Sequence, residues 1–125
     1  MTRIVFADSE PHIRQLCLEE LQDEGYEVQV TGQGREAVRL VDSFKPDVVI
    51  LEILLPDISG LETGRMIKGS RKETRVVLYS YSLPPHDLSA WGCDDFVVKS
   101  PNLDRLKAVV RRLTPSGKAK ARVQR

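Results

Sequence analysis

Four polar side chains stand at the ends of apolar runs in the sequence. They include two carboxylates and one ammonium, which could form a buried ion pair. The set comprises Asp8, Glu52, Ser80 and Lys99, which follow the runs RIVFA, DVVIL, RVVLY and DFVV. A charged side chain beside a buried strand needs a partner, because an unpaired buried charge is costly. The chemistry expected from this set is mutual pairing, with Glu52 facing Asp8 and Lys99.

A second pattern, GQGREA at residues 32–37, fits the glycine-rich turn that holds a pyrophosphate in dinucleotide-binding folds. Glu52 follows 18 residues after Gly34, near the place of a ribose-binding acid. Such a fingerprint belongs after the first, central strand, whereas this one follows a predicted edge strand. Nucleotide binding therefore stays an alternative, and a helix entry that uses glycines for backbone freedom is the simpler interpretation.

The histidines and cysteines form no catalytic or metal-binding set in the sequence. His12 and His86 have no third partner for nucleophilic catalysis, and Cys17 and Cys93 lack metal-ligand spacing. We interpret both cysteines as reduced thiols of a cytosolic protein, with one structural disulfide as the alternative.

Strand-like and helix-like segments alternate five times and would position these side chains. Strands are predicted at residues 3–7, 26–30, 47–53, 75–81 and 95–99, and helices at 11–24, 37–44, 60–70 and 103–113, with a short helix within 83–92. This alternation predicts an α/β fold, a parallel sheet with helices on both faces. In such sheets the ligand site lies at the carboxyl ends of the strands, where the four polar side chains stand.

Five segments of the chain together resemble the receiver domain of bacterial two-component response regulators. They are IVFADSEPHIR, EVQVTGQGREAVRLV, PDVVILEILLPDISGLE, VVLYSYS and GCDDFVVKS, and the resemblance spans residues 3–113. It implies a flavodoxin-like (βα)5 three-layer sandwich, with a parallel five-stranded sheet in the order 2-1-3-4-5.

The resemblance also implies roles for individual residues. In the family, an acidic pair after the first strand binds Mg²⁺, and an aspartate after the third strand accepts a phosphoryl group from a histidine kinase. A hydroxyl after the fourth strand and a lysine after the fifth contact the phosphate. Carried over, Asp8 matches the first acidic residue, Ser80 the hydroxyl and Lys99 the lysine. Phe96 matches an aromatic residue that changes rotamer with the switch.

Two positions depart from this pattern, since Ser9 replaces the second acidic residue and Glu52 replaces the phosphoacceptor aspartate. Mg²⁺ prefers charged oxygen ligands in octahedral geometry, so we expect Asp8 and Glu52 to hold it weakly or not at all. Glutamate also places its carboxylate roughly 1.5 Å farther out than aspartate. In-line phosphoryl transfer depends on positioning, so a displacement near 1 Å can slow it about a hundredfold.

Glu52 is open to three interpretations. It could reach Lys99 or Ser80 and imitate the phosphorylated arrangement, or it could belong to a decayed site in which it only pairs with Lys99. An engineered substitution or residual phosphorylation is the third. Because the sheet edge is expected to lie near solvent, we expect loss of the pair to cost about 1–2 kcal/mol.

Two further departures concern the segments around the last strand. Ser100 separates Lys99 from Pro101, where the family has Lys-Pro with a cis bond. We favour a trans Lys99–Ser100 bond, because cis would cost roughly 3 kcal/mol, with a cis bond held by strain as the alternative. The segment from Ser80 to Gly92 is about one helical turn shorter than usual. The output face of the family, here Leu83–Leu113, should therefore look unlike a standard one.

Composition fits one soluble domain, with 125 residues, 41% hydrophobic and 30% charged. No apolar stretch approaches the roughly 20 residues of a membrane helix, and charges throughout residues 1–20 give no sign of a signal peptide. The segment 114–125 holds four basic residues and no acidic one, which leaves 15 basic and 18 acidic residues in the rest of the chain. We expect this basic tail or linker to be disordered.

The sequence thus predicts a receiver domain at residues 1–113 and a tail at 114–125. We expect an atypical receiver, or pseudo-receiver, which is no enzyme, needs no cofactor and binds partners without phosphorylation. Expected partners are a histidine kinase or an output protein at the Leu83–Leu113 face of a cytoplasmic monomer or weak homodimer. We expect no membrane partner and no nucleic-acid partner of the receiver domain itself, with a weak nucleic-acid contact of the basic tail as an alternative. A working Mg²⁺-dependent phosphoacceptor and a nucleotide-binding α/β protein are the alternatives.

Overall fold

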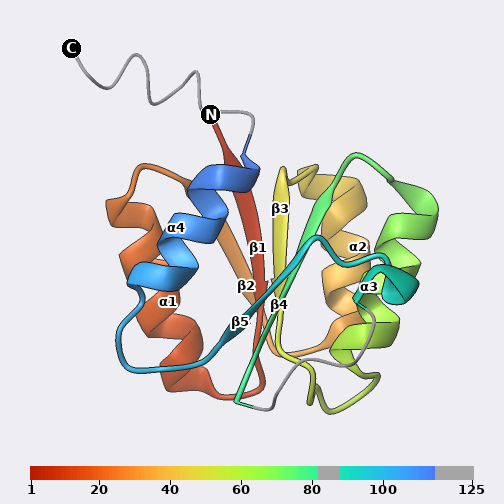
Figure 1. Cartoon of the computed structure of the whole chain (residues 1–125), viewed down its shortest axis with the longest axis horizontal. Coiled ribbons are helices and arrows are strands. Elements are labelled where there is room, and N and C mark those ends of the chain that lie inside the picture. The colour runs from red at the N-terminus through yellow and green to blue at the C-terminus, as the bar shows by residue number, and fades with distance from the viewer. Residues whose placement is uncertain (82–87, 115–125) are drawn as a thin grey trace.

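Five parallel strands form the centre of the fold, and helices cover both faces of the sheet (Figure 1). The computed structural model describes residues 1–81 and 88–114. The strands are β1 (Arg3–Ala7), β2 (Glu27–Thr31), β3 (Val48–Leu51), β4 (Arg75–Ser80) and β5 (Asp95–Val98). The helices are α1 (Pro11–Asp23), α2 (Gly34–Phe44), α3 (Gly60–Ser70) and α4 (Asp104–Leu113), with the short 3₁₀ helix η1 (Leu88–Trp91). The strand order β2-β1-β3-β4-β5 confirms the predicted flavodoxin-like topology.

Alternation along the central strands divides the core into two layers. In β1, Ile4 and Phe6 pack with residues of α1 and α4, whereas Val5 and Ala7 pack with residues of α2 and α3. All four residues of β3 are buried, as expected of a parallel strand covered on both faces. The continuous apolar runs of the sequence are therefore explained by burial on two sides.

Local signals in the sequence explain where the helices begin and how closely they pack. Pro11 lies in the first turn of α1, where its missing N–H is no loss. Ser59 caps α3, since its hydroxyl accepts a hydrogen bond from the Glu62 backbone N–H at 3.1 Å. Gly64 lies inside α3 because a Cβ there would stand 3.1 Å from the Val76 side chain, so the glycine lets the helix lie close to the sheet.

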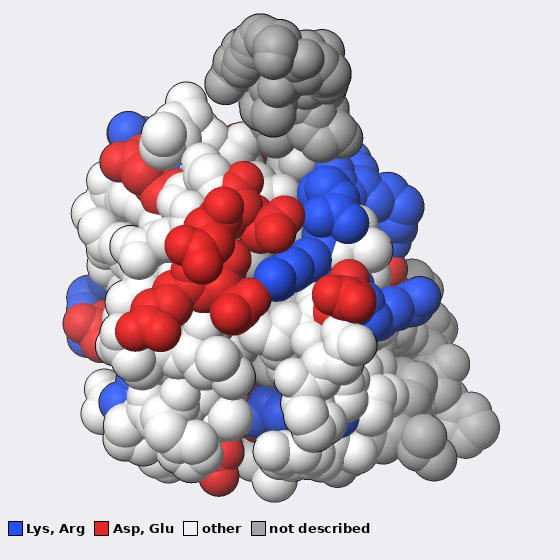
Figure 2. Space-filling view, turned by 90° about the vertical axis from the view of Figure 1, so that its left-hand side faces the viewer, with Lys and Arg blue, Asp and Glu red and all other residues white. Residues whose placement is uncertain are grey.

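Opposite charges line the outer surface of α1 and α4. Figure 2 shows acidic side chains beside basic ones on this face. Three ion pairs join α4 to α1 and its C-cap residue Glu24. Lys107 lies 2.6 Å from Glu20 and 3.8 Å from Glu24, and Arg111 lies 3.2 Å from Glu24. Ion pairs therefore connect the outer surfaces of these two helices.

The segment before β5 contains a short helix, η1, as predicted, and this segment packs against α3. The Arg65 guanidinium lies 5.0 Å from the centre of the Trp91 ring, and Lys68 pairs with Asp94 at 2.9 Å. Trp91 is half-buried against Arg65.

The first residue of the predicted tail, Thr114, is buried, and its backbone N–H donates to the Val110 carbonyl oxygen. Residues 82–87 and 115–125 lie outside the described residues, so disorder of the rest of the tail stays a prediction.

The described helices include none that is long and apolar enough to cross a membrane. Both cysteines, Cys17 and Cys93, are free thiols, which excludes the alternative of a disulfide between them. The described residues contain no cis peptide bond, in agreement with the trans Lys99–Ser100 bond that was favoured.

Candidate functional site

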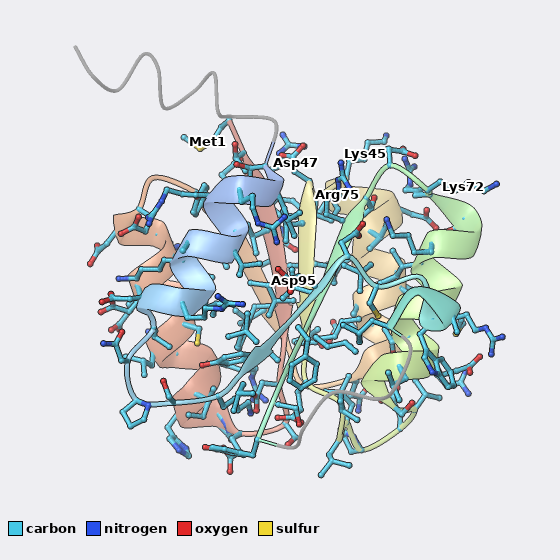
Figure 3. The ribbon with its side chains drawn as sticks, in the orientation of Figure 1. Met1, Lys45, Asp47, Lys72, Arg75 and Asp95 are labelled. Atoms are coloured by element: carbon cyan, nitrogen blue, oxygen red, sulfur yellow. The ribbon has the colours of Figure 1, made fainter. Side chains whose placement is uncertain are left out.

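The carboxyl ends of four adjacent strands bring the predicted side chains to one edge of the sheet. Asp47 and Arg75, at the amino ends of β3 and β4, mark the opposite edge (Figure 3). Three strands end earlier than predicted: β3 at Leu51, β4 at Ser80 and β5 at Val98. Glu52 and Lys99 are thus the first residues beyond their strands, and their backbone N–H groups still donate to the carbonyl oxygens of Ala7 and Ser80 on the neighbouring strands.

A small cavity of about 160 Å³ lies at this edge. Its lining comprises Ser9, Glu10, Glu52, Leu54, Ser80, Tyr81 and Lys99. Asp8, Glu52, Ser80 and Lys99 are all buried, whereas Ser9 is exposed. Phe96, the remaining predicted site residue, packs in the core layer that α2 and α3 cover. The structure therefore gathers the predicted polar residues, with Phe96 placed as a core residue.

The Lys99 ammonium is the centre of the site. Its Nζ lies 2.5 Å from Asp8 Oδ2 and also contacts Glu52 Oε1. The predicted pairing of Glu52 with Lys99 is confirmed, and Asp8 joins it. The expectation that the pair lies near solvent is wrong, because the side chains of Lys99 and Glu52 are only 4% and 7% exposed.

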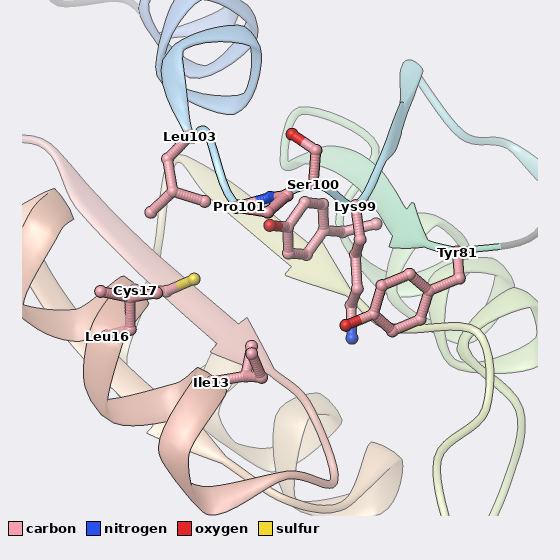
Figure 4. A pocket seen from close by; sticks show the side chains of 9 residues that line it. Ile13, Leu16, Cys17, Tyr81, Lys99, Ser100, Pro101 and Leu103 are labelled. Carbon is pink, nitrogen blue, oxygen red and sulfur yellow. The ribbon is translucent and has the colours of Figure 1, made fainter.

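Two tyrosine rings, which the sequence analysis did not assign to the ion pair, lie against the ammonium. The Nζ of Lys99 lies 5.5 Å from the centre of the Tyr79 ring and 5.0 Å from that of Tyr81. Figure 4 shows the Lys99 side chain reaching past Tyr81, at the end of a larger cavity of about 340 Å³ that Ile13 and Leu16 also line. Aromatic ring faces attract cations, so both rings favour the charged form of Lys99.

Backbone N–H groups hold the outer oxygens of both carboxylates. Asp8 Oδ1 accepts a hydrogen bond from the Glu10 N–H at 2.9 Å, and Glu52 Oε2 accepts one from the Leu54 N–H at 3.0 Å. All four carboxylate oxygens are therefore engaged, two by the backbone and two by Lys99. The arrangement fixes the direction of each carboxylate.

The titration of groups in and around the site follows from this burial and pairing. Burial alone would lower the pKa of Lys99, but hydrogen bonds to Asp8 and Glu52 together outweigh it and raise the pKa above its usual value. Burial, followed by the charge of Asp8, raises the pKa of the Cys17 thiol to about 12. Burial is also the largest cause that raises the pKa of Tyr79 and, to about 11, that of Cys93.

These raised pKa values predict that the fold weakens in alkali. A group whose pKa is higher in the folded chain contributes stability below its unfolded pKa and loses it as the pH rises through the folded value. For Cys17 this window runs from 9.0 to about 12, so the free energy of unfolding should be nearly constant from pH 7 to 8. It should fall by on the order of 2–3 kcal/mol from this thiol alone between pH 9 and 11. Urea melts across this range measure the effect.

The matched control for the alkaline prediction is Cys17→Ala, which lacks the thiol and should show a shallower decline above pH 9. A wild-type stability that is independent of pH up to 11 would contradict the assignment. The same slope in both proteins would remove Cys17 as a cause.

Gly60 approaches the backbone of Glu52 so closely that it fixes the loop after β3. A Cβ at this position would stand 2.1 Å from the carbonyl oxygen of Glu52. We predict that Gly60→Ala displaces this loop and costs about 1–3 kcal/mol of stability. Gly69→Ala in the same helix is the control, since a Cβ there meets nothing within 4 Å. Equal urea midpoints for the two variants would contradict the proposed close approach.

The glycine pattern at the start of α2 serves a different purpose from phosphate binding. The backbone N–H groups of Gly34 and Arg35 donate to the carboxylate of Asp57 at 2.8 and 2.9 Å. A Cβ on Gly34 would lie 2.3 Å from the Thr63 hydroxyl oxygen, so close packing explains this glycine. The pattern also follows the edge strand β2, as predicted. These contacts favour the simpler interpretation as a helix entry.

Sequence reasoning missed several residues that shape the site. Tyr79 was assigned only to a strand, and Leu54 and Gly60 only to the adjoining loop and helix. Leu54 is 73% exposed beside the buried Glu52, and its backbone N–H rather than its side chain serves the site. Only Gly60, at the start of α3, gave a signal in the sequence, and a glycine near a loop has many possible causes.

The sequence of this chain is similar to a known protein family and to several of its members. A family model described as the response regulator receiver domain matches residues 4–111. Two transcriptional regulatory proteins of Mycobacterium tuberculosis are similar: TrcR is 33% identical over 89% of this chain and 44% of its own length, and TcrA is 34% identical over 92% and 47%. The chain thus spans about half the length of these curated relatives.

Solved structures agree with this assignment. The response regulator protein TrrA of Thermotoga maritima, in complex with Mg²⁺-BeF, has a TM-score of 0.84 and 46% identity, covering 90% of this chain and 99% of that chain. TrrA in complex with the histidine kinase ThkA has a TM-score of 0.83 and 45% identity, covering 90% and 98%. A chemotaxis protein of Vibrio cholerae, CheY4, has a TM-score of 0.84 and 27% identity, covering 90% and 98%.

Proposed function

Because the chain belongs to the response regulator receiver domain family, we propose that it is an atypical receiver that binds signalling partners without accepting a phosphoryl group. One observation carries this proposal: Glu52, at the position matched to the phosphoacceptor aspartate, is buried and contacts Lys99. The lysine that would contact a phosphate is therefore already paired with two carboxylates. The site holds by itself the charge contact that phosphate would otherwise make.

The geometry of Glu52 opposes phosphoryl transfer. Its Oε1 is held by Lys99 and its Oε2 by the Leu54 N–H, so neither oxygen points freely into the cavity as a nucleophile would. An in-line attack depends on placing the attacking oxygen, and the extra methylene of glutamate moves it by roughly 1.5 Å. These two facts support a site that does not turn over phosphate by the usual route.

The residues present do not fit the Mg²⁺ site that the family implies. TrrA was crystallised with Mg²⁺-BeF, but here a serine, Ser9, stands at the second acidic position. No cluster of three potential metal ligands among His, Cys, Asp and Glu occurs in residues 1–81 and 88–114. Both inner carboxylate oxygens already contact Lys99. Mg²⁺ demands near-octahedral oxygen ligands, so we propose that this receiver works without it.

We propose a histidine kinase or an output protein as the partner. TrrA, which is similar to this chain, was solved in complex with a histidine kinase. Leu16 and Tyr81 are exposed hydrophobic residues on the side of the cavity in Figure 4, and they could contribute apolar contacts. The described part of the predicted Leu83–Leu113 face carries η1 in place of a longer helix, which would favour a partner specific to this chain. A cytoplasmic monomer or weak homodimer remains our expectation.

Incubation with a small phosphodonor tests the proposal. We predict that acetyl phosphate with Mg²⁺ leaves the mass of the chain unchanged, because the acceptor oxygen is displaced and Lys99 is already paired. Intact-mass spectrometry after timed incubation is the measurement. A stable gain of one phosphoryl group that disappears in Glu52→Gln would instead support a working phosphoacceptor.

A further inference from the structure

We propose that the pocket between Asp8, Glu52, Tyr79 and Tyr81 is a binding site for a primary alkylammonium ion, filled within the chain by Lys99, and not a site for a divalent metal. The pocket offers two inward carboxylate oxygens, Asp8 Oδ2 and Glu52 Oε1, to one nitrogen. Two ring faces complete it at 5.0 and 5.5 Å.

The chemistry of the walls distinguishes between these two cations. A divalent metal such as Mg²⁺ takes oxygen ligands and keeps several waters, and ring faces supply no such ligand. An ammonium ion donates hydrogen bonds to carboxylates and is attracted to ring faces when it is desolvated. The outer oxygens of Asp8 and Glu52 are already turned to the Glu10 and Leu54 N–H groups. The whole set matches an ammonium.

The charge and burial of the pocket point the same way. Asp8 and Glu52 carry two negative charges, and the side chains of Asp8, Glu52 and Lys99 are 0%, 7% and 4% exposed. Removing the ammonium would strand buried carboxylates, so another cation of the same shape should be drawn in. The aliphatic chain of Lys99 lines the larger cavity of about 340 Å³, which offers an alkyl chain a route to the pocket (Figure 4).

Rescue of a truncated lysine tests the site directly. Lys99→Ala removes three methylenes and the ammonium, so n-propylammonium is the matched probe. We expect 50 mM n-propylammonium chloride to raise the melting temperature of Lys99→Ala by at least about 3 °C and to leave the wild type unchanged. At equal ionic strength, n-propanol lacks the charge and tetramethylammonium lacks N–H donors. Mg²⁺ carries charge but has neither N–H donors nor an alkyl chain, so none of the three should match n-propylammonium.

A second variant links the rescue to the pocket. Lys99→Ala with Glu52→Gln keeps the space and removes one carboxylate, so n-propylammonium should stabilise it less. Greater stabilisation of Lys99→Ala by MgCl₂ than by n-propylammonium would overturn the proposal. Equal effects of n-propylammonium and tetramethylammonium, or no effect of either, would overturn it as well.

The wild-type chain provides a measurement that does not depend on the folding of any variant. A buried ammonium with fixed acceptors should give a protected lysine ¹H–¹⁵Nζ signal, unchanged by 10 mM MgCl₂. Loss or shift of that signal with MgCl₂, or its absence from the start, would contradict the ammonium site. The role of the ammonium site in signalling rests on the proposed function, but the two proposals fail in different experiments. Phosphoryl labelling of the wild type would overturn the proposed function, whereas failed rescue by n-propylammonium would overturn only the ammonium site.

Discussion

Lys99→Met should lower the free energy of unfolding by about 3–5 kcal/mol, because it leaves the buried carboxylates of Asp8 and Glu52 without their cation. Methionine keeps much of the aliphatic length of lysine, so the loss reports on charge more than on packing. The Asp8 side chain is fully buried and that of Glu52 is 7% exposed, so water cannot replace the ammonium well. Urea melts at pH 7 measure the change.

A double-mutant cycle separates pairing from other effects of the substitutions. Glu52→Gln alone should cost about 1–3 kcal/mol, since Lys99 keeps Asp8. Adding Glu52→Gln to Lys99→Met should recover part of the loss, because only Asp8 is then stranded. Lys107→Met is the matched control on the surface of α4, where the ion pair to Glu20 is partly exposed, and it should cost far less. Strictly additive losses would show that Glu52 and Lys99 do not interact.

The loss of unfolding free energy expected for Lys99→Met exceeds the 1–2 kcal/mol expected from the sequence, because the site is more deeply buried than the sequence indicated. A strand end at a sheet edge is commonly near solvent, and nothing in the run DFVVKS shows how deeply Lys99 lies. Burial depends on residues from other strands and loops, among them Tyr79 on β4 and the loop after β3. Pattern along one segment cannot report contacts made across the fold.

The parts of the fold that rest on periodicity were predictable. Continuous apolar runs gave the buried strands, and the alternation of strands with helices gave a parallel sheet, whose order the resemblance supplied. The pairing of Glu52 with Lys99 followed from the rule that buried charge needs a partner. The packing of η1 against α3 through Arg65 and Trp91 was not predictable, because a contact between a cation and an aromatic ring requires no fixed spacing in the sequence. The close approach of Gly60 to the Glu52 backbone was not predictable either, because a glycine in the sequence does not show which segment it lies against.

The two sequence departures from the family pattern can be reversed together, and we expect the result to be a gain of phosphorylation. Ser9→Asp with Glu52→Asp restores the second carboxylate and withdraws the acceptor oxygen by roughly 1.5 Å. The third carboxylate of the pocket gives a metal more of the oxygen ligands it prefers. After incubation with acetyl phosphate and Mg²⁺, the double variant should gain one phosphoryl group at a rate at least about a hundredfold above the wild type.

The single variants identify which departure matters more. Glu52→Asp alone corrects the position of the acceptor but leaves Ser9 exposed at the place of a carboxylate, so it should label only weakly. Ser9→Asp alone leaves Glu52 held by Lys99 and by the Leu54 N–H, so it should not label. Intact-mass spectrometry over time compares the four proteins, with chelation of Mg²⁺ as the control. Labelling of the wild type at the rate of the double variant would show that Glu52 is itself a competent acceptor. Failure of the double variant, while urea melts show that it is folded, would mean that other residues of the pocket, such as the tyrosines around Lys99, also exclude phosphoryl transfer.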